Sequence, residues 1–435
     1  MDDDGETAAG DATGDEAGDQ PQPLDGVTVI DAASLYAGPL AATYLSDFGA
    51  EVIKVEHPDG GDPLRQFGGD GRSWEWVGRN KQSVPLDLKD DDGQAAFLAL
   101  VEDADVLVES FRPGTLESWG LGWETLSKHN PGLVMVRTTG FGQTGPYSDR
   151  PGFGSLVEAM SGFAYSTGME DGPPTLPPIA LADSVCALHS AFAAMAALYW
   201  RDMGDGTGQY IDSSILESMF ALMGDVVARY DAEGDLFRRN GNTSRMTVPR
   251  NTYRTSDDRW VALSGSTENT ARRILRIIGG EEMVEQYPDM ETRIEHSEEI
   301  DQRIADWMAE RTREDVVDIF EEHEAALGPV YNMADIFDDE HFAARDAVIA
   351  VERETRPRGA SPDDRAESEA SREQDGESRR MRGVFPKLSE TPGSVEHSGP
   401  ELGAHARAVL RERAGLSDDE IDALVEDGVT ALVDD

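Results

Sequence analysis

The first 140 residues alternate short apolar runs with helical patterns, and this alternation limits the possible folds more than any other feature. Strands are expected at 27–31, 51–55, 104–109 and 133–138, and helices at 39–48, 93–102 and 115–129. Strands that alternate with helices in this way form a parallel sheet with helices on both faces. The sequence therefore predicts an α/β fold with a doubly wound parallel sheet.

Asp183 stands between a rigid loop and an apolar helix. Prolines occupy positions 173, 174, 177 and 178, whereas residues 184–200 are rich in Ala and Leu and contain no Gly or Pro. Helices tolerate Pro only in the first turn, so Asp183 is expected at the N-cap. Such a carboxylate can simply accept hydrogen bonds from the first turn, or it can act as an ionised nucleophile. The spacing does not choose between these roles.

Several segments are similar in order and spacing to CoA-transferase family III, the group that contains formyl-CoA and carnitine CoA-transferases. They are residues 24–65, NKQSVPLDLK at 80–89, ADVLVESFRPG at 104–114, GFGQTGP at 140–146, the DGPP to LADS stretch, 328–342 and 399–424. In that family the aspartate of the (A/G)DS element is the nucleophile, and Asp183 matches it. The resemblance implies that this aspartate carries CoA as an aspartyl-CoA thioester. It also implies a Rossmann-like large domain and an interlocked homodimer.

The domain organisation follows from this resemblance and from shifts in composition. Residues 1–23 are acidic and predict a disordered tail. The expected large domain covers 24–215, a linker 216–245 and a smaller α+β domain 246–335, which opens with a hairpin at 252–264. The chain then returns to the large domain at 336–435, with a mobile acidic insertion at 354–382, where apolar residues are scarce.

The charge balance constrains the partners and the setting. With 86 acidic and 38 basic residues, the formal net charge is -48, which opposes binding to nucleic acid and to anionic lipid. An acidic excess of this size suits a surface hydrated in concentrated salt, and no targeting segment is evident. We therefore expect a cytoplasmic halophilic protein without a membrane span. The single cysteine, Cys186, excludes an intramolecular disulfide.

The CoA contacts are carried over from the family position by position. They are Tyr36, Ala37, His57, Leu86, Lys89, Ser110, Phe111, Arg112, Gly152 and Phe153. Backbone N–H groups near Ala37 and Gly38, where a helix begins, are candidates to bind a thioester oxyanion or phosphate. His57 stands where several relatives have an arginine, and Ser110 replaces the usual asparagine.

Other chemistries lack their residues. GFGQTG at 140–145 matches the dinucleotide pattern G-x-G-x-x-G, but Pro146 and Pro151 interrupt the segment where the phosphate-binding helix would begin. No P-loop, zinc-peptidase or α/β-hydrolase motif is present, and the eight histidines show no metal spacing. We expect no metal and no tightly bound cofactor, with CoA thioesters as substrates.

The predicted activity is transfer of CoA from an acyl-CoA to a free carboxylic acid. Succinyl-CoA is the first expectation for the donor, and mesaconate, malate or a similar C4–C5 dicarboxylate for the acceptor. Arginines at 238, 239, 245 and 250 are unusual in so acidic a chain and are candidates to bind an acceptor carboxylate. The alternatives are an α-methylacyl-CoA racemase and a catalytically idle acyl-CoA binding protein. The racemases have a histidine base where this chain has Phe153, which favours transfer.

Overall fold

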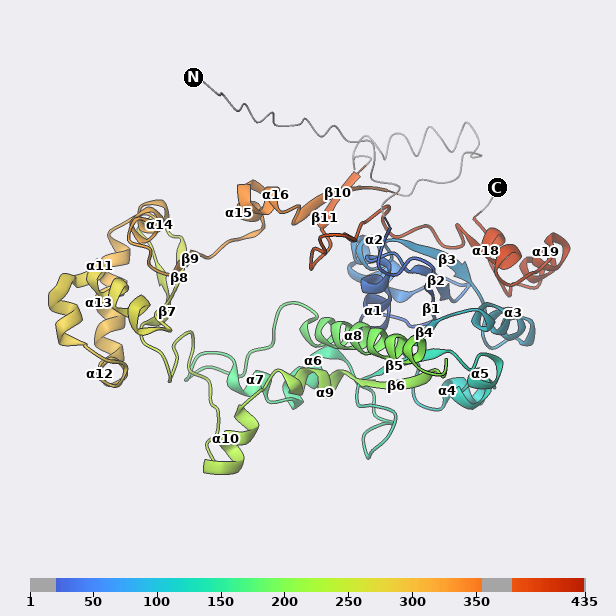
Figure 1. The fold of residues 1–435 in the computed structure, drawn as a ribbon, viewed down its shortest axis with the longest axis horizontal. Helices are drawn as coiled ribbons and strands as arrows, with labels where there is room; N and C mark the ends of the chain where they lie inside the picture. The colour runs from blue at the N-terminus through green and yellow to red at the C-terminus, as the bar shows by residue number, and fades with distance from the viewer. Residues whose placement is uncertain (1–20, 354–377, 434–435) are drawn as a thin grey trace, which may run out of the picture. The chain divides into compact units, whose positions relative to one another are not determined.

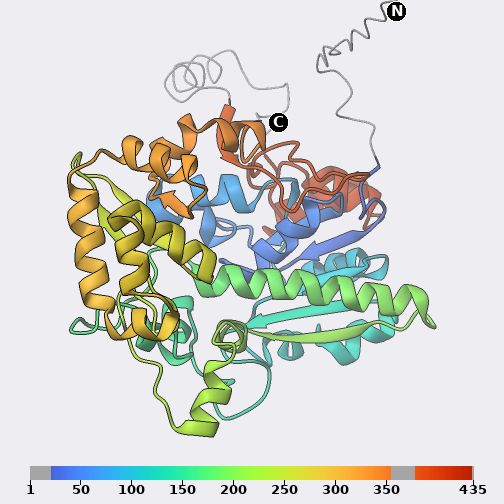
Figure 2. The same ribbon diagram turned by 60° about the vertical axis from the view of Figure 1, so that its left-hand side comes forward.

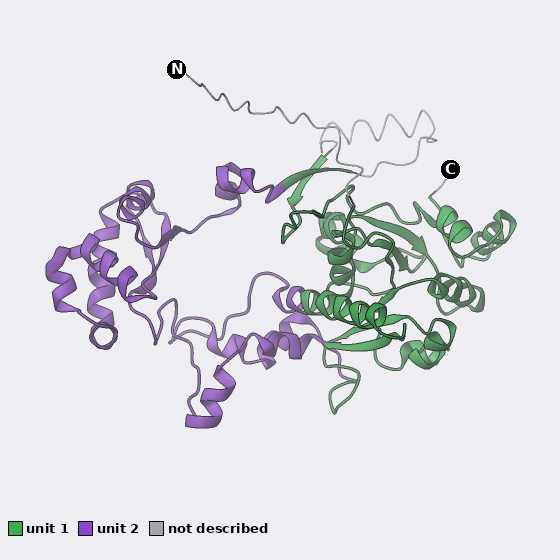
Figure 3. Cartoon of the chain, viewed as in Figure 1, with its two compact units in different colours: residues 1–149, 186–213, 349–435 green, residues 150–185, 214–348 purple. Residues whose placement is uncertain are grey.

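The computed structural model describes residues 21–353 and 378–433. The chain folds into two compact units, coloured separately in Figure 3. Unit 1 contains residues 1–149, 186–213 and 349–435, and unit 2 contains 150–185 and 214–348.

Unit 1 is built on a six-stranded sheet. Its strands are β1 (Thr28–Asp31), β2 (Glu51–Glu56), β3 (Lys81–Pro85), β4 (Val106–Glu109), β5 (Val134–Thr139) and β6 (Gln209–Ser214). They lie in the order β3-β2-β1-β4-β5-β6, and the neighbours from β3 to β5 pair in parallel. This is the strand order of a doubly wound sheet, whose direction of winding reverses between β1 and β4.

Helices complete unit 1 (Figure 1). They are α1 (Ala37–Ser46), α2 (Arg72–Val77), α3 (Asp91–Glu102), α4 (Thr115–Ser118), α5 (Trp123–His129), most of α8 (Leu181–Met203), α18 (Ala406–Glu412) and α19 (Asp418–Glu426). A two-stranded sheet joins β10 (Val348–Glu352) and β11 (Ser378–Arg382), and short 3-10 turns span Pro63–Arg65 and Phe67–Gly69.

The strands of unit 1 bury alternate residues on opposite faces. Ile30, Ile53, Leu107 and Met135 belong to one core cluster, together with residues of α3 and α18. Val29, Val52, Val106 and Val134 belong to a second cluster, together with residues of α1 and α8. A two-residue period on each strand thus gives the sheet two apolar faces, and both faces are covered by helices.

Helix α8 is the long green helix that is most visible in Figure 2. Among the described residues, it alone is long and apolar enough by composition to cross a membrane, and 39% of its apolar window is buried. The buried face packs on the sheet through Ala191, Ala194 and Leu198. Core helices of globular proteins meet the same length and composition criteria.

Unit 2 begins with α6 (Gly154–Met160), α7 (Phe163–Ser166) and the first residues of α8, and continues with α9 (Ile215–Ala221) and α10 (Val226–Glu233). An antiparallel sheet of β7 (Arg250–Arg254), β8 (Trp260–Ser264) and β9 (Leu327–Pro329) follows. The remaining helices are α11 (Glu268–Gln286), α12 (Met290–Glu295), α13 (Ser297–Ala309), α14 (Arg313–Glu322), α15 (Met333–Asp338) and α16 (Glu340–Ala344). A third core cluster joins the sheet to α11, α13 and α14.

Three sequence predictions differ from the observed elements. Asp183 is the third residue of α8 and not its N-cap, because the helix begins at Leu181, after the last proline. The predicted linker at 216–245 contains helix α10 and most of α9. Residues 378–382 of the predicted insertion form β11, where Arg382 lies over the rings of Tyr44 and Trp76. The rest of that insertion, and residues 1–20 of the predicted tail, lie outside the described residues.

Candidate active site

A pocket of about 270 Å³ opens at the carboxyl ends of the strands of unit 1. Its lining comes from the end of β2, from the segments that follow β1 to β4 and from the end of α4: Ala32, Ala33, Ser34, Lys54, Val55, Glu56, His57, Gly61, Asp62, Pro63, Leu86, Asp87, Leu88, Lys89, Phe111 and Trp119. Ligands of open α/β sheets bind outside these strand ends, where the winding direction reverses. The pocket therefore lies where this topology places a ligand site.

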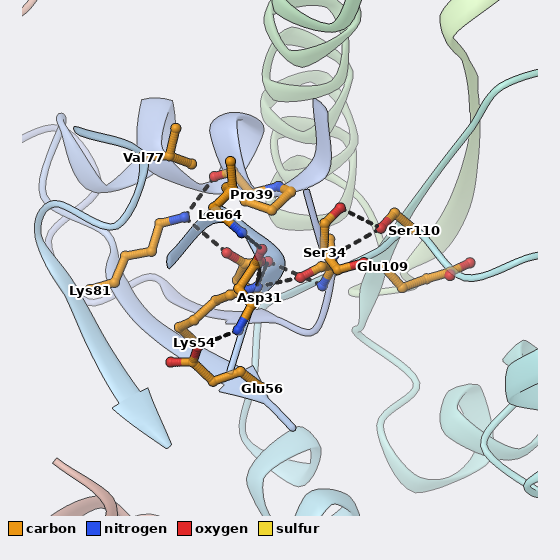
Figure 4. Close-up of polar contacts among 12 residues, drawn as sticks. Asp31, Ser34, Pro39, Lys54, Glu56, Leu64, Val77, Lys81, Glu109 and Ser110 are labelled. Atoms are coloured by element: carbon orange, nitrogen blue, oxygen red, sulfur yellow. Dashed lines mark hydrogen bonds and ion pairs between the residues drawn. The ribbon is translucent and has the colours of Figure 1, made fainter. Parts of the chain in front are cut away.

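A network of buried charges fixes one wall of this pocket (Figure 4). Lys54 Nζ lies 3.0 Å from Asp62 Oδ2 and 3.5 Å from Asp31 Oδ1, and it also donates to the carbonyl oxygen of Ala33. Lys81 Nζ lies 2.9 Å from Asp31 Oδ2 and donates to the carbonyl oxygen of Pro39 at 2.7 Å. The two lysines therefore join β2 and β3 to the loop after β1 and to the first turn of α1.

The same network extends to Glu56 and Arg65. Glu56 accepts hydrogen bonds from Arg65 Nη2 at 2.7 Å and from the backbone N–H of Asp62 at 2.8 Å. Burial alone would raise the pKa of Asp31 and of Glu56, but the neighbouring cations outweigh it and hold both pKa values below normal. Three cationic side chains thus balance three carboxylates, and a buried network of this kind is stable only when its members are paired.

Hydrogen bonds hold the loop between β1 and α1 at successive residues. Asp31 Oδ1 accepts from Ala33 N at 3.1 Å, and Asp62 Oδ1 accepts from Leu35 N at 3.2 Å. Ser110 Oγ accepts from Ser34 N at 2.9 Å and donates to Ser34 O at 3.1 Å. Leu35 has a φ of 64°, which is uncommon for a branched residue and requires such support.

The start of α1 lies close against this loop. A Cβ on Gly38 would lie 2.4 Å from Ala33 Cβ and 2.9 Å from Thr138 Oγ1, so only glycine fits there. The first N–H groups of a helix have no acceptor within the helix, and here they belong to Ala37 and Gly38. Such groups can bind anionic oxygens, and the expected contact of this turn with an oxyanion or a phosphate stays a prediction.

The predicted CoA residues of unit 1 are only partly brought together. His57, Leu86, Lys89 and Phe111 line the pocket. Tyr36 and Ala37 begin α1, and Ser110 supports the pocket wall through Ser34 without lining the pocket itself. Arg112 is exposed and is not among the lining residues.

The predicted nucleophile lies in unit 2, where α6 contacts the first turn of α8. Asp183 is half-buried. A Cβ on Gly154 would lie 2.2 Å from Asp183 Oδ2, so the carboxylate occupies the space that this glycine leaves open. Glu158, one turn further along α6, is 2% exposed, and its Oε1 accepts from Ala182 N at 3.2 Å. Gly152 and Phe153 directly precede α6, and Phe153 is 61% exposed.

The environment of Asp183 disfavours its charge. Burial is the larger cause and the negative charge of Glu158 the second, and together they raise the pKa of Asp183 from 3.8 to about 6. A carboxylate with a raised pKa is still ionised at neutral pH and is more basic than an ordinary aspartate. This combination suits a nucleophile.

The other motifs form no site of their own. The GFGQTG loop follows β5, but the next helix, α6, begins only at Gly154. The loop therefore lacks the helix that a dinucleotide site requires. Arg239 donates to the carbonyl oxygen of Tyr165, and Arg245 lies 3.9 Å from Asp235. Arg250 lines a different pocket in unit 2, beside Asn242 and Asn251. Within the described residues, no three His, Cys, Asp or Glu side chains are grouped as metal ligands.

Several residues of the site support others and were not predicted from the sequence. Lys54 interrupts an apolar strand with a charge, which is a detectable signal because buried strands rarely carry unpaired lysines. Lys81 gives no such signal, because it begins β3, whose first residues are polar. Glu158 and Gly154 are four residues apart on a helix, but nothing in the sequence indicates that Asp183 faces them.

Comparisons with known proteins agree with this arrangement. The profile of CoA-transferase family III matches residues 24–406. The beta subunit of a succinyl-CoA–L-malate CoA-transferase from Chloroflexus aurantiacus is 40% identical over 92% of this chain and 96% of its own length. A succinyl-CoA:mesaconate CoA-transferase from Haloarcula hispanica is 35% identical over 76% of this chain and 86% of its own.

A solved structure extends the likeness to the fold. The crystal structure of a CAIB/BAIF family protein from Brucella suis has a TM-score of 0.76 and 27% identity, covering 90% of this chain and all of the other. The profile match, the identities and the shared fold lead to one conclusion: the chain belongs to CoA-transferase family III.

Proposed function

We propose that this enzyme moves CoA from succinyl-CoA to a C4 or C5 dicarboxylic acid, with Asp183 as its nucleophile. The observation that carries the proposal is the carboxylate of Asp183, held against Gly154 with a pKa raised to about 6. The named activities of the Chloroflexus and Haloarcula relatives support this choice of donor and acceptor class.

The proposed mechanism conserves charge in each step. A carboxylate oxygen of Asp183 attacks the thioester carbonyl of succinyl-CoA, the C–S bond breaks, and CoA leaves as a thiolate. The thiolate then attacks the Asp183 carbonyl of the mixed anhydride and releases succinate, which leaves an aspartyl-CoA thioester. The acceptor carboxylate repeats these steps in reverse. Covalent catalysis divides one difficult exchange into steps of similar free energy.

CoA itself requires a nucleotide site, and we propose that the unit 1 pocket supplies it. Leu86 and Phe111 offer apolar surface for the adenine, and Lys89 and His57 offer donors for the phosphates. Ala37 and Gly38, at the start of α1, offer N–H groups to an oxyanion. Arg112, Gly152 and Phe153 remain candidates for contacts outside this pocket.

The proposed assembly is a homodimer. Leu188, Phe192, Tyr199 and Met203 recur at helical spacing along α8 and are 54%, 75%, 70% and 71% exposed. An apolar stripe of this length on a helix is typical of a surface that another chain covers. The net charge of -48 and the Haloarcula relative support a halophilic, cytoplasmic enzyme without nucleic acid or membrane partners.

The test is an assay with defined substrates. Purified protein is incubated with succinyl-CoA in molar KCl together with malate, mesaconate, citramalate, glutarate or acetate, and new CoA esters are identified by mass spectrometry. We expect esters of the C4 and C5 dicarboxylates and little ester of acetate. Failure to transfer CoA to any dicarboxylate would contradict the proposed substrate class.

A parallel assay examines the racemase alternative, which requires a second base where Phe153 stands. The enzyme is incubated with 2-methylacyl-CoA in deuterated buffer, and NMR follows the α-proton. We expect no exchange, because the phenyl ring cannot accept a proton. Exchange as fast as CoA transfer would make the racemase the leading assignment.

A further inference from the structure

Helix α6 presents two residues of one face to the first turn of α8. Gly154 and Glu158 are four residues apart and therefore lie one above the other on the helix. Gly154 leaves the space that Asp183 Oδ2 fills, and Glu158 Oε1 accepts from the N–H of Ala182, the residue before Asp183. One helix face thus sets both the position and the electrostatic surroundings of the carboxylate.

Glu158 is an unusual group to find there. It is only 2% exposed, and the one hydrogen bond to its carboxylate among the described residues comes from a neutral backbone N–H. It is also the charged side chain, on any described element, that raises the pKa of Asp183. A buried carboxylate beside a second carboxylate destabilises the fold, so its presence there calls for an explanation in the reaction.

We infer that Glu158 is a positioning residue whose negative charge favours the covalent state of Asp183. The inference rests on the proposed role of Asp183 as the nucleophile. Its basis is the placement of Glu158 on α6, buried and bonded to the turn that carries Asp183.

The reaction itself explains how a repulsive charge helps. Before transfer, Asp183 is an anion beside Glu158. In the aspartyl-CoA thioester Asp183 is neutral, and the negative charge has left with the released carboxylate of the donor acid. The repulsion between Glu158 and Asp183 is therefore relieved when the thioester forms. Removing the charge of Glu158 should stabilise the free carboxylate and reduce the fraction of thioester.

Protonation of Asp183 relieves the same repulsion, because it also converts the anion to a neutral group. The loss of Glu158 should therefore change two equilibria by the same factor in opposite directions. It raises the acid dissociation constant of Asp183, which is a fall in its pKa, and it lowers the equilibrium constant for thioester formation. A fall of one pKa unit corresponds to a fall of about tenfold in that constant. A purely structural role gives no reason for the two changes to match.

The experiment compares Glu158→Gln with wild type. Gln keeps an oxygen for the Ala182 N–H but removes the charge. The fall of kcat/KM at low pH, its acidic limb, reports the pKa of Asp183. Mass spectrometry of protein equilibrated with succinyl-CoA and succinate gives the fraction of thioester. We expect the limb to move to lower pH and the thioester constant to fall in proportion. Glu158→Asp keeps the charge, so its limb and its thioester constant should lie closer to those of wild type. Glu321→Gln, an exposed change on α14, should leave both quantities at their wild-type values.

Each outcome decides the inference. An unchanged limb and thioester constant in folded Glu158→Gln would overturn it, and so would a fall in the constant without a shift of the limb. If Glu158→Gln does not fold, the wild-type limb can still overturn the inference, because a limb near 3.8 would mean that neither burial nor Glu158 raises the pKa of Asp183. An absence of thioester in wild type during rapid transfer would instead contradict the proposed nucleophile.

Discussion

At the scale of single residues, the structure explains why Asp183 is costly to the fold. Its pKa is about 6 in the folded protein and near 3.8 in an unfolded chain. The folded state therefore binds the proton more tightly, and ionisation of Asp183 destabilises it. This loss of unfolding free energy is absent well below pH 3.8 and grows as the pH rises towards 6. Above pH 6 it stays constant.

Asp183→Asn should consequently stabilise the protein while abolishing transfer. We expect the free energy of unfolding to rise by roughly 1–3 kcal/mol at pH 8, and by about half as much at pH 5. Urea unfolding at both pH values in the same KCl concentration measures the difference. A variant less stable than wild type at pH 8, or equally changed at both pH values, would show that Asp183 is not strained by its surroundings.

Gly154 gives a second prediction at this scale. The methyl group of Gly154→Ala would lie 2.2 Å from Asp183 Oδ2, so the carboxylate must move. Displacement of a reacting group by about 1 Å can cost two orders of magnitude in rate. We expect kcat to fall at least tenfold with CoA binding unchanged, whereas Ser155→Ala, an exposed neighbour, should keep its activity. A kcat of Gly154→Ala within twofold of wild type would mean that this contact does not position Asp183.

At the scale of elements, the pattern of apolar residues predicted the apolar strands of the sheet but did not predict how the site is assembled. Residues 27–31 and 51–55 closely match β1 and β2. Strand β3 was not predicted, because Lys81, Gln82 and Ser83 break its apolar pattern. Lys81 is buried because it is paired with Asp31 and donates to the carbonyl oxygen of Pro39. The pocket and the contact of α6 with Asp183 depend on how distant segments pack, which neither period nor spacing records.

The buried charges between these elements should be expensive to break. Lys81→Met leaves Asp31 with Lys54, at 3.5 Å, as its cationic partner among the described residues, and it removes the donor to the carbonyl oxygen of Pro39. Loss of one partner from a buried pair costs about 3–5 kcal/mol of unfolding free energy. Arg72→Met breaks an exposed pair with Asp70 and should cost less than about 1 kcal/mol. If urea unfolding gives equal losses of unfolding free energy for Lys81→Met and Arg72→Met, the network does not hold the start of α1.

At the scale of the whole molecule, the family assignment is confirmed by the profile that covers residues 24–406. The predicted α/β fold with a parallel sheet is confirmed as well. The sequence could indicate these because the family segments are spread along most of the chain. The boundaries of the predicted domains differ from the two units, since residues 150–185 lie in unit 2.

The exposed stripe of α8 tests the proposed dimer. Phe192 is 75% exposed, and Phe192→Glu would place a charge in the proposed apolar interface. We expect light scattering in molar KCl to give a dimeric mass for wild type and a monomeric or unfolded species for this variant. Val425→Glu, on α19, should remain dimeric. A dimeric mass for Phe192→Glu would show that α8 is not in the interface.

The most direct test of the central claim is to capture CoA on Asp183. Protein is mixed with succinyl-CoA without acceptor, treated with borohydride or hydroxylamine, digested, and sequenced by mass spectrometry. The proposed mechanism requires modification of Asp183 in wild type and none in Asp183→Ala. An unmodified Asp183 peptide, under conditions in which transfer to a dicarboxylate is fast, would contradict it.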